Sequence, residues 1–127
     1  KEMSRITGLS VEEIQSNRPM VVKEFIKKHE CTLVLKGAST LVGNSKFDDL
    51  YVNTTGNPGM ATGGSGDVLA GIIASFVAQK VDVFKSAIAG VNVHGAAGDK
   101  VSEKYSMMGN TPTLMLNELP SVLKILE

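Results

Sequence analysis

The chain has 127 residues, 43% of them hydrophobic and 20% charged, so it has the composition of a globular protein and the size of one small domain or of part of a larger one. Its 13 basic and 13 acidic residues cancel, which excludes a global field for nucleic acid or an anionic membrane and makes any anion site local. No apolar run approaches the roughly 20 residues of a membrane span, and the single Cys31 excludes an internal disulfide, so we expect a cytoplasmic protein without a nucleic-acid or membrane partner.

A capping box that begins at Ser10 predicts a short helix over residues 11–16, which Asn17 and Arg18 terminate. A proline then suits the first turn of a second helix, over residues 19–29, whose apolar residues share one face.

Three strands are predicted next. The apolar run over residues 32–35 indicates a buried strand that ends at Lys36 and Gly37. Two further strands, over residues 40–43 and 49–53, flank a turn and predict a β-hairpin.

The rest of the chain is predicted to be helical after a glycine-rich loop. The pattern indicates one helix over residues 67–79 and a longer one over residues 82–105, with Asp82 as its N-cap. Residues 111–127 are predicted to form one or two short helices broken near Pro120. This order of elements predicts the α/β class, with helices packed on a sheet.

About three strands are fewer than a doubly wound sheet usually has. We therefore expect residues 1–127 to hold only the C-terminal portion of their fold, with a partial sheet and flanking helices. A partial sheet leaves a strand edge and an apolar face without cover. The chain is accordingly expected to form a homo-oligomer or to pair with the missing half.

The stretch NTTGNPGMATGGSGDVLAG, residues 53–71, has six glycines and runs directly into the predicted helix. A helix N-terminus presents unpaired backbone N–H groups, and glycine lets a phosphate approach them closely. We therefore expect Gly64, Ser65 and Gly66 to form an anion hole. Asp67 beside a phosphate is useful as a general base that takes a proton from an attacking hydroxyl. The alternative is that Asp67 only caps the helix.

The motif TGGSGDVLAG resembles the anion hole and catalytic base, G-x-G-D, of the ribokinase-like kinases. The longer NTTGNPGMATGGSGDVLAGIIA, together with LVLKGAST and GVNVHGAAGD, resembles one branch, the ADP- or ATP-dependent NAD(P)H-hydrate dehydratases, found as the C-terminal domain of YjeF-type repair proteins. The resemblance covers nearly the whole chain. It implies a three-layer α/β/α fold, of which residues 1–127 are the C-terminal portion.

The resemblance also implies a reaction, in which a hydrated NADH or NADPH is phosphorylated on its ring hydroxyl and then loses phosphate. The implied small molecules are this hydrate and an adenine nucleotide, ADP or ATP, which we expect to bind with Mg²⁺; no residue is predicted as a metal ligand. In this family the catalytic aspartate, here Asp67, also faces the hydrate. The positions that match the family's nucleotide-binding residues are Lys36, Gly37, Ala38, Ser39, Thr40 and Gly66.

Two other functions stay open at this point: a kinase for a sugar or vitamin precursor, and a non-catalytic nucleotide-binding half-domain. Lys36 either contacts nucleotide phosphates or ends its strand in solvent. His94 lies among the glycines of the 82–105 helix, which close packing against the glycine loop explains more simply than a catalytic histidine does.

Overall fold

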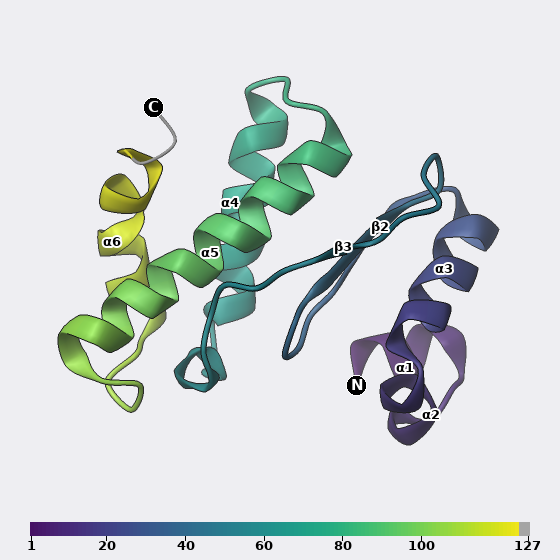
Figure 1. The fold of residues 1–127 in the computed structure, drawn as a ribbon, viewed down its shortest axis with the longest axis horizontal. Coiled ribbons are helices and arrows are strands. Elements are labelled where there is room, and N and C mark those ends of the chain that lie inside the picture. The colour runs from purple at the N-terminus through teal and green to yellow at the C-terminus, as the bar shows by residue number, and fades with distance from the viewer. Residues whose placement is uncertain (125–127) are drawn as a thin grey trace. The chain divides into compact units, whose positions relative to one another are not determined.

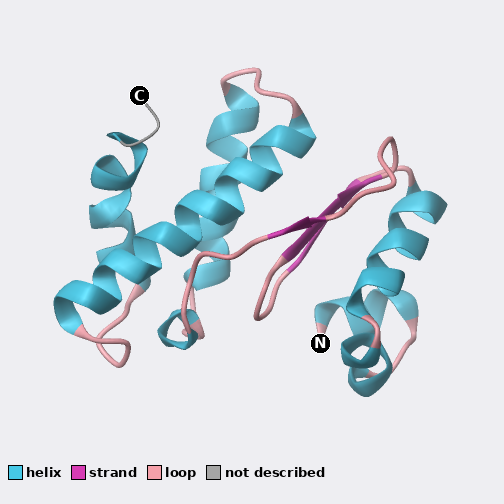
Figure 2. Ribbon diagram, in the orientation of Figure 1, coloured by secondary structure: helices cyan, strands magenta, loops and turns pink. Residues whose placement is uncertain are grey.

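The computed structural model describes residues 1–124. The chain divides into two compact units, Lys1–Val52 and Asn53–Glu127, and each is described by itself. Figure 1 follows the chain through both units, and Figure 2 shows that the strands belong to the first, while the second is built from helices and loops.

The first unit consists of three helices and a three-stranded antiparallel sheet with the strand order β1-β2-β3. Leu35 of β1 pairs with Leu41 of β2, which pairs with Val52 of β3. The predicted hairpin is therefore confirmed, and β1 extends it into a continuous meander. The bounds are α1 Glu2–Thr7, α2 Val11–Ser16, α3 Arg18–His29, β1 Thr32–Leu35, β2 Leu41–Asn44 and β3 Tyr51–Val52.

Helices α2 and α3 begin at side-chain caps. The capping box is confirmed, because Ser10 accepts from the N–H of Glu13 at 3.1 Å and the Glu13 carboxylate accepts from the N–H of Ser10 at 2.7 Å. Asn17 caps α3 by accepting from the N–H of Met20 at 3.3 Å. The predicted helix over residues 11–16 is confirmed, and the next helix begins one residue earlier than predicted, at Arg18, because Asn17 both closes α2 and caps α3.

The core of the first unit lies between its helices and the sheet. At Gly43, strand β2 lies close to α3, and a side chain there would overlap Val22 and Leu50. The buried apolar residues of this core are Met3, Ile14, Val21, Val22, Ile26, Leu35 and Leu41.

The second unit packs two helices, α4 and α6, against the long helix α5. Its elements are η1 Pro58–Met60, α4 Ser65–Ala78, α5 Val83–Tyr105 and α6 Pro112–Leu123. Asp82 caps α5 as predicted, by accepting from the N–H groups of Phe84 and Lys85 at 3.1 Å. The core residues are Val68, Ile72, Val93, Ala97, Val101, Met115 and Val122.

Two boundaries of the second unit differ from the prediction. Helix α4 begins at Ser65, two residues before Asp67, because Gly64 takes the left-handed conformation that ends the loop. Pro120 does not break α6. Met115 and Val122, 0% and 5% exposed, anchor the helix on both sides of the proline.

The glycines of α5 allow close packing, as predicted. A side chain at Gly95 would overlap Thr55, and one at Gly98 would overlap Met60, both from the glycine loop. No helix within residues 1–124 combines the length and the apolar character that crossing a membrane requires.

Candidate functional site

The glycine loop starts with two side chains that bind the backbone of α5. The amide of Asn53 donates to the carbonyl oxygens of Thr55 and Val91 at 3.0 and 3.2 Å. The hydroxyl of Thr55 donates to the carbonyl oxygen of Asn92 at 2.9 Å. Asn53 is buried, so these bonds fix the start of the loop from inside.

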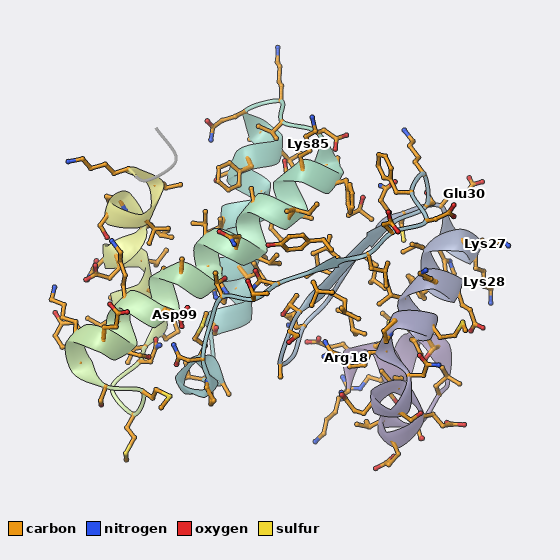
Figure 3. All side chains as sticks on the ribbon, in the orientation of Figure 1. Arg18, Lys27, Lys28, Glu30, Lys85 and Asp99 are labelled. Atoms are coloured by element: carbon orange, nitrogen blue, oxygen red, sulfur yellow. The ribbon has the colours of Figure 1, made fainter. Side chains whose placement is uncertain are left out.

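The middle of the loop is held by Asp99 of α5, labelled in Figure 3. Its carboxylate accepts from the N–H of Gly56 and from the side-chain amide of Asn57, both at 2.8 Å. The side-chain oxygen of Asn57 accepts in turn from the N–H of Gly59 at 3.0 Å and from the hydroxyl of Ser102 at 2.9 Å. The side chain of Asn57 is thus used in hydrogen bonds that hold the loop. No local pattern indicated this role of Asp99, because 42 residues separate it from Asn57.

The loop ends at an open helix N-terminus. Gly64 is the N-cap of α4, with φ 88°, and no side chain caps the helix. The N–H of Ser65 donates to the carbonyl oxygen of Thr62 at 3.2 Å. No hydrogen bond among the described residues uses the N–H of Gly64 or Gly66. These two backbone donors are therefore free to bind an anion.

Asp67 is the third residue of α4 and does not cap it, so the alternative reading of this residue was wrong. The cap position belongs to Gly64. The Asp67 side chain is exposed and makes no hydrogen bond or ion pair with residues 1–124. Its charge is favourable beside the positive end of the helix dipole, and its oxygens are available to a ligand.

Gly63, just before the cap, is not required by the fold. Its φ is not positive, and a methyl group in its place would meet no atom within 4 Å. The backbone on this side of the loop is therefore open. The phosphate groups of a nucleotide fit such a surface, since they need backbone donors and close access more than side chains.

Ser65 turns its side chain inward, to His94 of α5. The Ser65 hydroxyl and His94 Nε2 are 3.2 Å apart, and both residues are buried. Burial lowers the pKa of His94 below the usual 6.5, and the hydrogen bond with Ser65 offsets part of this effect. At neutral pH the imidazole of His94 is therefore uncharged, and it contacts the first turn of α4 through the Ser65 hydroxyl.

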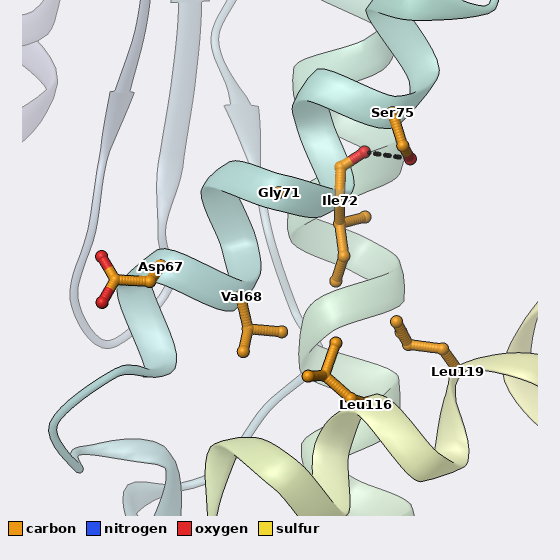
Figure 4. Close-up of a pocket in the computed structure, with 7 residues that line it drawn as sticks. All are labelled: Asp67, Val68, Gly71, Ile72, Ser75, Leu116 and Leu119. Carbon is orange, nitrogen blue, oxygen red and sulfur yellow. Dashed lines mark hydrogen bonds between the residues drawn. The ribbon is translucent and has the colours of Figure 1, made fainter.

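A groove of about 460 Å³ runs along α4 and α6. Figure 4 shows the Asp67 carboxylate pointing away from Leu116 and Leu119. The hydroxyl of Ser75 donates to the carbonyl oxygen of Ile72 at 2.8 Å, so it offers the groove little polarity. The groove therefore offers an anion few donors, and the free backbone N–H groups lie at the N-terminus of α4. The lining residues are Asp67, Val68, Gly71, Ile72, Ser75, Leu116 and Leu119.

The predicted nucleotide segment forms a loop between β1 and β2, which we call the 36–40 loop. Lys36 is exposed and lies 3.4 Å from the Glu2 carboxylate. Gly37 and Ser39 have positive φ angles of 149° and 53°. The hydroxyl of Thr40 donates to the carbonyl oxygen of Gly37 at 3.1 Å.

The structure thus brings Lys36, Gly37, Ala38, Ser39 and Thr40 together in the first unit. It brings Gly64, Ser65, Gly66 and Asp67 together in the second. Within residues 1–124, no group of three or more His, Cys, Asp or Glu side chains is placed to hold a metal ion.

Residues 1–121 match the family model described as NAD(P)H-hydrate dehydratase. The chain belongs to this family. A "Bifunctional NAD(P)H-hydrate repair enzyme Nnr" of Thermofilum pendens is 42% identical over 125 residues, which are 98% of this chain and 24% of that protein. An "ADP-dependent (S)-NAD(P)H-hydrate dehydratase" of Neisseria meningitidis is 47% identical over 102 residues, 80% of this chain and 34% of that protein.

The fold agrees with this membership of the NAD(P)H-hydrate dehydratase family. The ADP/ATP-dependent NAD(P)H-hydrate dehydratase of Bacillus subtilis, co-crystallized with ATP/Mg²⁺, superimposes with a TM-score of 0.94 at 31% identity. The match covers 99% of this chain and 45% of that one. The chain therefore spans less than half the length of these relatives. The predicted family and its ribokinase-like α/β fold are confirmed.

Proposed function

We propose that the chain supplies the nucleotide-binding segment and the catalytic base of an ADP- or ATP-dependent NAD(P)H-hydrate dehydratase. The observation that carries the proposal is the unpartnered carboxylate of Asp67 beside the open N-terminus of α4. A carboxylate next to a phosphate site is costly because like charges repel, unless it accepts a proton during the reaction.

Each group has one task in this proposal. When bound, the nucleotide supplies the phosphoryl group that turns the ring hydroxyl of the hydrate into a leaving group. Asp67 accepts the proton of that hydroxyl. The N–H groups of Gly64 and Gly66 bind phosphate oxygens, and Ser65 contributes the inward contact with His94 that steadies them. Loss of phosphate, together with a proton from the adjacent ring carbon, then restores the double bond of NADH or NADPH.

In the first unit, the nucleotide would be held by the 36–40 loop. Mg²⁺ keeps several waters and binds mainly to substrate phosphates, so it needs no cluster of protein carboxylates. The residues present fit that arrangement, because the described chain has open backbone donors and lacks such a cluster.

The proposal includes the setting of the protein. Residues 1–127 act as the C-terminal portion of a ribokinase-like domain, in the cytoplasm, without nucleic-acid or membrane partners. The antiparallel sheet of the first unit ends in β3, of which only two residues pair with β2. Such an edge is suited to further strands, so we also propose a homo-oligomer.

The test combines binding with turnover. Titration calorimetry with ADP and ATP in the presence of Mg²⁺ should detect binding, and the full-length protein, given hydrated NADH and nucleotide, should restore the absorbance of NADH. Binding of neither nucleotide would refute the proposal. Phosphate transfer to a sugar without repair of the hydrate would favour the kinase, and binding without any turnover would favour the nucleotide-binding half-domain.

A further inference from the structure

The 36–40 loop is held by one side chain, that of Arg18 at the start of α3. Arg18 Nη1 donates to the carbonyl oxygen of Ala38 at 2.6 Å, and Nη2 donates to that of Leu35 at 3.0 Å. The guanidinium therefore bridges the end of β1 and the middle of the loop, as its planar fork permits. Figure 3 labels this residue.

Both partners are arranged around this contact. The Asn17 cap and a proline at the next position fix the backbone of Arg18 at the first turn of α3. On the other side, a Cβ atom at Gly37 would lie 3.0 Å from Arg18 Nη2, tighter than nine in ten such contacts. The glycine thus leaves the space that the guanidinium occupies.

The loop that Arg18 holds is conformationally costly. Ser39 has a φ of 53°, in the left-handed region that a residue with a side chain rarely adopts. Such a conformation persists only where the surrounding structure determines it, and it is common at ligand clamps. The flanking contacts are the bond from Arg18 to Ala38 and the bond from Thr40 to Gly37.

The charge of Arg18 has no counter-ion within residues 1–124. Its two bonds go to neutral carbonyl groups, and its buried Nε has no hydrogen-bond partner among the described residues. The described ion pairs do not include it. A partly buried cation without a carboxylate favours the approach of an anionic ligand.

We propose that Arg18 is a positioning residue for the adenine nucleotide: its guanidinium holds the 36–40 loop in the shape that binds, and its charge favours the anionic ligand. This inference rests on the proposed function, and it adds a residue that lies 18 positions before the binding segment. Lysine cannot replace Arg18 in this role, since one ammonium group does not reproduce the planar fork across two carbonyl groups.

The decisive comparison is Arg18→Lys against Arg5→Lys, an exposed arginine of α1, each in the whole chain. ADP and ATP with Mg²⁺ are titrated by calorimetry, and thermal melting without nucleotide reports folding. Arg18→Lys should weaken nucleotide binding about tenfold or more, from the loss of one charge-assisted hydrogen bond, while Arg5→Lys binds like wild type. Hydrogen exchange of residues 36–40 should become faster in Arg18→Lys alone.

The outcomes separate the two proposals. If the wild type binds but Arg18→Lys binds equally well, the positioning role is refuted and the proposed function stands. If the wild type binds no nucleotide, both are refuted. A loss of binding that only parallels a loss of folding would make Arg18 structural. If Arg18→Lys does not fold, Arg18→Gln, which keeps a planar donor, is judged by the same criterion.

Discussion

The two candidate loops reach their shapes in different ways. The 36–40 loop is exposed and depends mainly on the single side chain of Arg18. The glycine loop of the second unit is tied to α5 at several points, by buried and half-buried polar groups and by glycines that allow contact. A shape that depends mainly on one side chain is lost when that side chain changes, whereas a shape held at many points is kept when one contact is lost. This contrast suits a binding loop and a loop that carries chemistry.

The largest expected effect tests whether the second loop carries the chemistry. Asp67→Asn keeps the size of the side chain but removes the proton acceptor, so turnover should fall by about 10²- to 10⁴-fold. Nucleotide affinity should stay the same or rise, because a negative charge beside the phosphates is gone. Steady-state kinetics and calorimetry of the full-length protein measure both, with the exposed Asp49→Asn as control. A variant that keeps half its rate would leave Asp67 without a catalytic role.

The packing of the second loop is tested by the same change, glycine to alanine, at two positions. Gly95→Ala should lower the free energy of unfolding by about 1–3 kcal/mol, because the new methyl group overlaps backbone and side-chain atoms of Thr55. Gly71→Ala in α4 meets no atom within 4 Å and should raise it by up to about 1 kcal/mol through helix propensity. Denaturant unfolding compares them. Equal effects would show that α5 does not contact the loop as described.

Asp99→Asn asks how well the second loop tolerates the loss of one anchor. The new amide group faces a donor, either the N–H of Gly56 or the amide of Asn57, and leaves it unsatisfied. We expect the free energy of unfolding to fall by about 1–2 kcal/mol. Nucleotide affinity should change less than in Arg18→Lys. The reverse order of affinities, measured by calorimetry, would overturn the contrast between the two loops.

The smallest effect concerns pH. Because the pKa of His94 is lower in the folded chain than the usual 6.5, the unfolded chain binds more protons just below that pH. Stability from this group is complete above about 6.5 and is lost as the pH falls toward the lowered value. Urea unfolding across this window should therefore show stability rising with pH, and His94→Gln should flatten the rise. Equal slopes in both proteins would exclude His94 as the source.

The sequence predicted the features that local rules determine. The caps at Ser10 and Asp82, the strand over residues 32–35 and the family motif around Asp67 were all confirmed. These depend on neighbours within a few positions. The short helix α1 was missed, although the left-handed Gly8 that ends it was a possible signal.

What the sequence did not predict depends on contacts between distant residues. The sequence placed Arg18 only at a helix boundary. Its contacts could not be predicted, because its carbonyl partners lie 17 and 20 positions away. Asp99 binds residues of the glycine loop that lie 42 and 43 positions before it. The N-cap of α4 is Gly64, because the backbone there is left-handed. Glycine permits this conformation, but its presence in a sequence does not predict it. Candidate residues were thus predictable, while the residues that hold them were not.

The uncapped N-terminus of α4 has a consequence for any mutational survey of this protein. An anion bound by the N–H groups of Gly64 and Gly66 meets donors that do not ionise and that every amino acid except proline carries. Side-chain truncation therefore cannot delete this site, and a screen by alanine replacement would add atoms to the glycines it is meant to strip. Such a site is altered only when a new side chain blocks it or when the backbone moves. Its sensitive positions are therefore the glycines at which a substitution adds a side chain.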